Sequence, residues 1–251
     1  MLNEQEKARY HRQILLDEIG EEGQKRLKRA KVLVAGVGGL GCATSVYLAS
    51  AGVGWMQIVD CDRVSLSDLN RQVLYSNKDI GKAKVDLAKA RLESLNPEVH
   101  IEAVDEKISE GGVFKLAAGC DAIVDGMDNL PARYLLNRAA ICCNIPLFHG
   151  AVHGFEGKVT TVIPGRTPCL NCLYRDTVPA TEIPVIGTTP AVIGCIQANE
   201  VVKYIVGAGE LLTNRILIYD GLSSRFREVS VARDTDCSEC SKLFKRKGSR
   251  N

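Results

Sequence analysis

The stretch from Lys31 to Asp60 constrains the fold of this 251-residue chain more than any other segment. Residues 31–35 form a short apolar run rich in valine, which predicts a buried parallel strand. The run leads into Gly36-Val-Gly-Gly-Leu-Gly41, which fits the pattern G-x-G-x-x-G, and a helix is predicted from 42 to 51. A second apolar strand over 55–59 ends at Asp60. Strand, glycine turn, helix and strand together predict a Rossmann-like unit.

Each part of this unit has a chemical reason to hold a nucleotide. The glycines Gly36, Gly38 and Gly41 permit positive φ and leave no Cβ between the backbone and a phosphate, while the following helix offers free N–H groups to an anion. Asp60, at the end of the second strand, is placed to accept hydrogen bonds from ribose hydroxyls. The alternative of a tight turn without a ligand is less favoured because all the parts occur together. The pattern does not choose the nucleotide, since dinucleotide oxidoreductases share it.

Strands alternate with helices over the next hundred residues. Apolar strands are predicted at 99–104, 121–125 and 145–149, with helices at 81–96, 111–118 and 131–142 between them. Beyond Gly150 the strands 158–163, 215–220 and 226–231 resemble a more antiparallel region, interrupted by a helix over 190–206. We therefore expect an α/β fold with a doubly wound, mainly parallel sheet that continues into a more antiparallel C-terminal part. The expected organisation is one unit, 1–251, with a nucleotide-binding half at 31–150 and a second half at 151–240.

Bulk composition excludes several classes of function. The chain has 45% hydrophobic and 25% charged residues and a net charge of +2, which gives no electrostatic basis for binding nucleic acid or a membrane surface. No apolar run approaches the roughly 18 residues of a membrane span. The polar first residues lack the apolar core of a signal peptide. We expect a cytoplasmic protein.

Four of the ten cysteines form two C-x-x-C pairs, Cys169 with Cys172 and Cys237 with Cys240. Two such turns complete a closed tetrahedral site, and four thiolates suit zinc with no open position for water. The predicted site is therefore structural, and it ties the C-terminal segment to the middle of the chain. The alternative is a redox C-x-x-C, which two pairs make less favoured. The other six cysteines are predicted to be small buried apolar residues.

Polar residues follow the predicted strand ends, where open α/β sheets bind their ligands. These residues are Asp60, Asn70, Arg71, Lys84 and Asp128. Arg71 and Lys84 offer fixed positive charge to phosphate oxygens, and Asp128 is a candidate ligand for magnesium. The chain has no Walker A sequence. The combination favours chemistry at a triphosphate over hydride transfer.

The order and spacing of these motifs give the chain a resemblance that covers roughly residues 5–240. It resembles the ThiF/MoeB/HesA family, relatives of the adenylation domain of ubiquitin-activating E1 enzymes. The motifs that carry the resemblance are Arg9-Tyr-His-Arg12-Gln13, Gly36-Val-Gly-Gly-Leu-Gly41, Asp60-Cys-Asp62, Asp68-Leu-Asn-Arg71-Gln72, Gly81-Lys-Ala-Lys84, Asp128-Asn129 and the paired C-x-x-C.

The resemblance implies a definite reaction. Family members use MgATP to adenylate the C-terminal Gly-Gly carboxylate of a small ubiquitin-like sulfur-carrier protein, releasing pyrophosphate. It implies ATP and Mg²⁺ as cofactors beside structural Zn²⁺, a homodimer, and a sulfur-donor protein as a further candidate partner. It assigns carrier binding to the half at 151–240.

The resemblance also implies roles for individual residues. Arg12 reaches the triphosphate bound by the partner subunit, Asp60 holds the ribose, and Asp128 binds magnesium. Positions implied to contact the nucleotide are Gly36, Gly38, Gly39, Gly41, Asp60, Asp62, Ser67, Asn70, Arg71, Gln72, Lys84, Asp128 and Asn129. The implied catalytic set is Arg12, Arg71, Lys84 and Asp128.

One departure concerns covalent transfer. Several family members carry a cysteine between the first zinc pair and the following helix, but residues 173–190 of this chain contain none. We therefore expect adenylation without a thioester at this segment. An NAD-dependent oxidoreductase, a non-catalytic scaffold for a ubiquitin-like partner, and an enzyme acting on a small molecule or a tRNA base remain as alternatives. The sequence leaves the pathway open between thiamine, molybdopterin and other sulfur metabolism.

Overall fold

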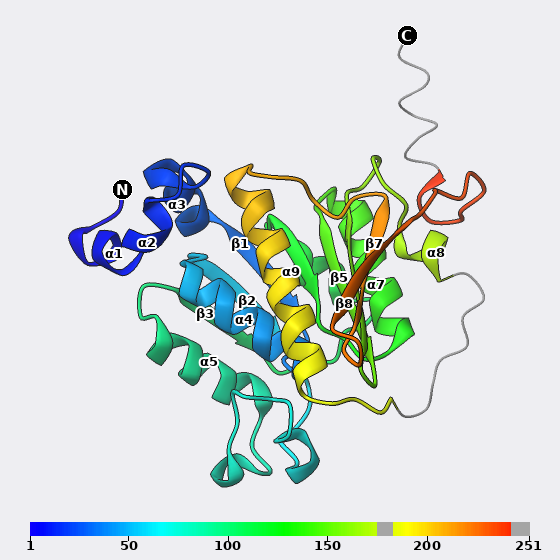
Figure 1. Cartoon of the computed structure of the whole chain (residues 1–251). Coiled ribbons are helices and arrows are strands. Elements are labelled where there is room, and N and C mark those ends of the chain that lie inside the picture. The colour runs from blue at the N-terminus through cyan, green and yellow to red at the C-terminus, as the bar shows by residue number, and fades with distance from the viewer. Residues whose placement is uncertain (175–182, 242–251) are drawn as a thin grey trace.

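The computed structural model describes residues 1–174 and 183–241, and its centre is an eight-stranded sheet in the order β3-β2-β1-β4-β5-β6-β7-β8 (Figure 1). The first five strands in this order run parallel, and the last three pair antiparallel. The strands are β1 Lys31–Ala35, β2 Trp55–Val59, β3 His100–Val104, β4 Ala122–Asp125, β5 Leu147–His153, β6 Glu156–Val162, β7 Arg215–Asp220 and β8 Arg225–Ser230. The predicted fold class, parallel first and antiparallel after, is confirmed.

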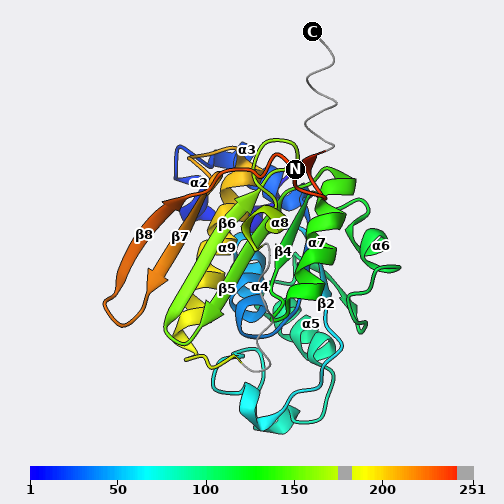
Figure 2. The same ribbon diagram turned by 90° about the vertical axis from the view of Figure 1, so that its right-hand side faces the viewer.

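Helices cover both faces of the parallel part. Helices α4, α5 and α9 pack on one face, while α6 and α7 cover the other (Figures 1 and 2). Three short helices precede β1, and α1 opens with a capping box formed by Asn3 and Glu6. The α-helices are α1 Glu4–Arg9, α2 His11–Ile14, α3 Gly20–Arg29, α4 Gly39–Ala51, α5 Lys84–Leu95, α6 Val113–Ala117, α7 Leu130–Cys143, α8 Leu170–Leu173 and α9 Thr188–Val206, with 3₁₀ turns η1 Leu66–Asp68 and η2 Asn77–Asp79.

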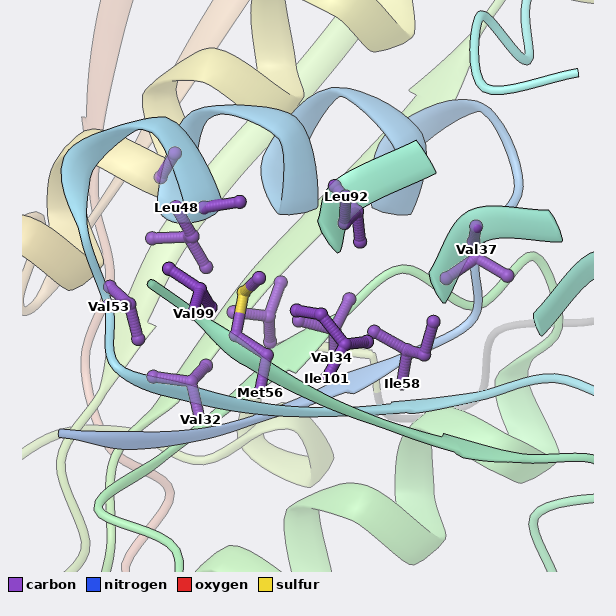
Figure 3. Packing of buried hydrophobic residues seen from close by; sticks show 14 of the residues in the cluster. Val32, Val34, Val37, Leu48, Val53, Met56, Ile58, Leu92, Val99 and Ile101 are labelled. Atoms are coloured by element: carbon purple, nitrogen blue, oxygen red, sulfur yellow. The ribbon is translucent and has the colours of Figure 1, made fainter. Parts of the chain in front are cut away.

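Strand β1 supplies both layers of the core. Val32 and Val34 face α4 and α5, where they pack with Met56, Ile58 and Leu48 (Figure 3). Leu33 and Ala35 point to the opposite face and belong to the cluster under α7. All four β1 side chains are fully buried. A strand buried on both faces must be apolar throughout, which explains why this run has no polar alternation.

Glycines allow the closest approaches between the elements around the glycine turn. Gly36 has a φ of +87°, which favours glycine, and a Cβ on Gly41 would lie 1.8 Å from the carbonyl oxygen of Gly36. On α9, a Cβ on Gly194 would lie 2.7 Å from the Cβ of Ala43. The absence of a side chain at Gly194 lets α9 pack directly against α4, and Thr44 Oγ1 donates to the Gly194 carbonyl at this crossing.

The structure shifts some predicted boundaries. Helix α4 begins at Gly39, inside the glycine run, three residues before the predicted start at 42. Strand β5 does not end at His149 but continues through Gly150 to His153, since it forms a hairpin with β6. The predicted halves 31–150 and 151–240 therefore share one continuous sheet.

Within residues 1–174 and 183–241, no helix combines the length and the apolar character that crossing a lipid bilayer would require.

Candidate active site

A cavity of about 720 Å³ lies where the parallel strands end. Its walls come from the segments after β1, β2, β3 and β4, and from the first turn of α9. Predicted nucleotide-binding residues that line it are Gly36, Gly38, Gly39, Asp60, Asp62, Ser67, Arg71, Gln72, Lys84, Asp128 and Asn129. The fold thus brings together eleven predicted residues from the segments after β1, β2 and β4 and from the start of α5, as expected for the carboxyl edge of an open α/β sheet.

Asp60 braces the glycine turn. Its Oδ2 accepts a hydrogen bond of 2.9 Å from the backbone N–H of Val37, and its Oδ1 accepts one from Asp62. Burial raises the pKa of Asp60, and the two N–H donors and Lys84 oppose that rise. Each carboxylate oxygen has one protein donor, so each keeps acceptor capacity for a ligand hydroxyl.

The carboxylate of Asp68 organises the cationic side of the cavity. Asp68 ends the 3₁₀ turn η1, where its Oδ2 accepts from the backbone N–H and hydroxyl of Ser65 in a capping box. Lys84 Nζ lies 3.5 Å from Oδ2, and its other carboxylate neighbour, Asp62, lies at 3.3 Å. Burial alone would raise the pKa of Asp68, but the Ser65 hydrogen bonds and the charge of Lys84 hold it below its usual value.

Lys84 is the first residue of α5 and only 4% exposed. A buried ammonium is costly to leave without partners, so the two carboxylates account for its position. Asp68 also accepts from Gln72 Nε2 at 2.8 Å through Oδ1, which lies 3.5 Å from Arg71 Nη2. One buried anion therefore holds three donor side chains beside the cavity.

The segment after β4 forms the opposite wall. Asp128 is exposed in the cavity lining, and its Oδ1 accepts from Asn129 Nδ2 at 3.2 Å. Asn129 also caps α7 by accepting from the Ala132 N–H. Arg133 donates to the Met127 carbonyl with Nε at 3.1 Å and Nη2 at 2.7 Å, which fixes the backbone next to Asp128.

A buried polar chain behind this wall was not anticipated from the sequence. His149 Nδ1 lies 2.6 Å from Asp125 Oδ2, and His149 Nε2 lies 2.8 Å from the Tyr174 hydroxyl. Complete burial lowers the pKa of His149 although Asp125 opposes this, and burial raises the pKa of Tyr174 to about 12. A neutral imidazole therefore donates to Asp125 and accepts from Tyr174. The sequence feature that could have revealed this contact is that Asp125 and His149 are polar residues at the ends of two predicted apolar strands.

Three predicted residues lie outside the cavity lining. Gly41 is buried against the Gly36 carbonyl, where it permits close packing. The Asn70 side chain accepts from Arg71 Nη1 at 3.0 Å. Arg12 is exposed on α2, before β1 and away from the carboxyl ends of the strands (Figure 1).

The four paired cysteines converge on one point between α8 and the C-terminal segment. Sγ of Cys169 lies 3.6 Å from that of Cys237 and 3.9 Å from that of Cys172, while Cys172 and Cys240 are 3.6 Å apart. Four sulfurs at about 2.3 Å from one tetrahedral zinc ion lie about 3.8 Å from each other. The cluster therefore fits a structural zinc ion, as the spacing predicts.

The remaining cysteines are less uniform than expected. Cys42 and Cys120 are buried, but Cys61 and Cys142 are exposed, so the prediction of six buried apolar cysteines is wrong for those two. Cys61 lies in the polar segment after β2, and Cys142 lies in the last turn of α7. The exposure of their side chains depends on how these segments pack, which the cysteine spacing does not predict. Of the cysteine-free segment 173–190, residues 175–182 lie outside the described residues.

Comparison with known proteins identifies the family. The sequence model of the ThiF family matches residues 10–239. The chain belongs to the ThiF family. It is 41% identical to the SAMP-activating enzyme E1 of Haloferax volcanii, over 92% of this chain and 88% of that protein. It is 40% identical to the sulfur carrier protein adenylyltransferase of Thermus thermophilus, over 94% and 91%.

Among solved structures, E. coli MccB superposes with a TM-score of 0.84 and 24% identity, covering 95% of this chain and 74% of that chain. This likeness shows that the chain and MccB share a fold.

Removal of one zinc ligand tests the metal centre of this ThiF-family chain. We expect Cys237→Ser to lose the bound zinc. Loss of a closed site lowers the free energy of unfolding by about 3 kcal/mol or more, which lowers Tm by about 10 °C. Metal analysis and calorimetry of the purified protein measure both effects. Cys142→Ser, which changes an exposed cysteine outside the cluster, is the matched control. Equal zinc content in both variants would contradict the assignment.

Proposed function

We propose that this chain uses ATP to adenylate the C-terminal carboxylate of a small ubiquitin-like sulfur-carrier protein that ends in Gly-Gly. One observation carries the proposal. A relative 40% identical over nine-tenths of both chains is a sulfur carrier protein adenylyltransferase, and the cavity of this chain holds the fixed cations that such a reaction needs. The related SAMP-activating E1 supports the same class of partner.

The chemistry needs charge neutralisation more than acid–base catalysis. The carrier carboxylate is ionised at neutral pH and attacks the α-phosphorus directly. A bond from carboxylate oxygen to phosphorus forms, the bond from that phosphorus to the bridging oxygen breaks, and pyrophosphate leaves with its electron pair. An anion approaching a polyanion is repelled, so positioned cations lower the barrier. Arg71 and Lys84 are assigned this role.

The other cavity residues are assigned to nucleotide binding. Gly36, Gly38 and Gly39 let the phosphates approach the backbone, and the N-terminus of α4 faces the same space. Asp60 is assigned to the ribose hydroxyls. Asp62, Ser67, Gln72 and Asn129 complete the wall, and Asn70 contributes through its hydrogen bond to Arg71.

Asp128 is our candidate for the magnesium ligand. Magnesium prefers one or two carboxylates together with phosphate oxygens and water. The alternative group in the described residues, Asp60, Cys61 and Asp62, is less suited, because Asp60 is assigned to the ribose and Asp62 already lies 3.3 Å from Lys84 Nζ. Magnesium bound at Asp128 would offset phosphate charge on the side of the cavity opposite Lys84.

The competing functions lack a comparable observation. A hydride-transferring enzyme would not need Lys84 held by two carboxylates at the cavity edge, and a non-catalytic scaffold would not need Arg71. The pathway that consumes the activated carrier, and the protein that donates sulfur to it, lie beyond this proposal.

Loss of either cation should abolish activation. We expect Arg71→Ala and Lys84→Met to reduce carrier-dependent ATP–pyrophosphate exchange about 100-fold, because each removes charge stabilisation that is needed only when the phosphorus is attacked. Lys82→Met is the control, since Lys82 is 59% exposed and absent from the cavity lining.

Exchange that persists in Arg71→Ala, or that proceeds equally with a carrier lacking its two terminal glycines, would argue against this mechanism.

Subunit mixing tests the implied role of Arg12. We propose a homodimer in which Arg12 of each subunit serves the partner's cavity, supported by its distance in the fold from the cavity of its own chain. Arg12→Ala and Arg71→Ala dimers are each expected to be inactive. After subunit exchange, half of the dimers are mixed, and each has one complete site, so activity should return to about a quarter of the wild-type level. No recovery in dimers shown to be mixed would place Arg12 in its own chain's site or outside the reaction.

A further inference from the structure

The polar chain of Asp125, His149 and Tyr174 is buried at a place where apolar side chains would cost less. Asp125 and His149 are 0% and 1% exposed, and they lie at the ends of neighbouring strands β4 and β5. A buried polar group costs free energy unless every donor and acceptor is paired. Here the hydroxyl, both imidazole nitrogens and both carboxylate oxygens have partners.

One end of this chain fixes the wall that carries Asp128. Asp125 Oδ1 accepts from the Met127 N–H at 3.0 Å, which shapes the turn immediately before Asp128. Arg133 lies 3.6 Å from Asp125 Oδ2 and donates to the Met127 carbonyl, so the same backbone unit is held at its N–H and its carbonyl. Rotation of the Asp125 carboxylate would disturb both its hydrogen bond from the Met127 N–H and its ion pair with Arg133.

The other end reaches the helix that carries two zinc ligands. Tyr174 directly follows α8, in which Cys172 lies and which Cys169 caps. The Tyr174 carbonyl accepts from the Tyr134 hydroxyl at 2.9 Å, and its ring packs edge-on against His149 with centroids 5.3 Å apart. The phenol is therefore held by backbone, ring and hydroxyl contacts at once.

We propose that Tyr174 and His149 are positioning residues that transmit the placement of the zinc-bearing helix α8 to the Asp125 carboxylate and so fix Asp128 for the binding of MgATP. The inference rests on the proposed function, because it takes Asp128 as the magnesium ligand. Groups that orient a metal ligand from behind commonly alter metal affinity when they are lost, although they never touch the metal. None of the three is itself a lining residue of the cavity, and Asp125 acts on the lining through Met127 and Arg133.

The test measures the magnesium dependence of ATP binding by calorimetry, without any carrier protein. Tyr174→Phe removes one hydroxyl and keeps the ring, and we expect it to raise the Mg²⁺ concentration for half-maximal ATP binding about tenfold. His149→Asn retains an amide donor for Asp125 but is too short to reach Tyr174, so the same shift is expected. The double variant should shift the half-maximal Mg²⁺ concentration no further than either single variant, because both substitutions remove the same hydrogen bond between His149 and Tyr174.

The matched control is Tyr10→Phe. The Tyr10 hydroxyl is also buried and accepts a 2.8 Å hydrogen bond, from Asn96, but it lies near α1 and away from the cavity. Its Mg²⁺ dependence should equal that of the wild type, and both tyrosine variants should retain zinc and lose a similar, small amount of Tm.

The outcomes separate this inference from the proposed function. Wild-type binding of MgATP with an unchanged Mg²⁺ dependence in Tyr174→Phe overturns the positioning role alone, as does an equal shift in Tyr10→Phe. Loss of zinc from Tyr174→Phe also overturns it, since the hydroxyl would then support the metal centre. A wild-type chain that does not bind MgATP contradicts the proposed function itself.

Discussion

The buried carboxylate of Asp68 is the contact on which the charge arrangement of the cavity depends. Without it, Lys84 would be a buried ammonium with a single carboxylate neighbour, Asp62, and Gln72 would lose its 2.8 Å acceptor. Arg71 and Lys84 come from different elements and would repel each other if nothing lay between them. A fixed anion beside two cations keeps both at the edge of the cavity, where a polyphosphate can reach them. In the mechanism that we propose, these two cations stabilise the charge that develops when the carboxylate attacks ATP.

The two faces of the sheet are packed by different elements that border different parts of the cavity. On one face α4 and α9 pack through Gly194, which sets the position of the glycine turn. On the other face α7, which follows the segment that carries Asp128, packs in one apolar cluster with the paired cysteines. The turn at Gly36 lies directly against Gly41 of α4, a close approach that leaves no space for a side chain at Gly41.

The sequence predicted the family, the fold class and the zinc ligands, because each leaves a local pattern. A short valine-rich run such as 31–35 that leads into a glycine turn favours a buried strand, and C-x-x-C pairs have few chemical interpretations. The role of Asp68 in positioning the cations was not predicted, because its sequence position indicates only a helix cap. Its contact with Lys84, 16 residues later, forms only in the folded chain. The contact between His149 and Tyr174 joins residues 25 apart through tertiary packing alone. The catalytic assignments, including that of Arg12, stay predictions until they are measured.

The most direct measurement is the mass of the carrier protein after incubation with the purified enzyme, ATP and Mg²⁺, with no sulfur donor present. The account predicts a carrier whose mass increases by one adenylyl group, in an adduct that hydroxylamine cleaves and that requires the terminal glycine. The enzyme itself should gain no carrier through a thioester. An unmodified carrier in the presence of bound ATP would contradict the central claim that this cavity activates a protein carboxylate.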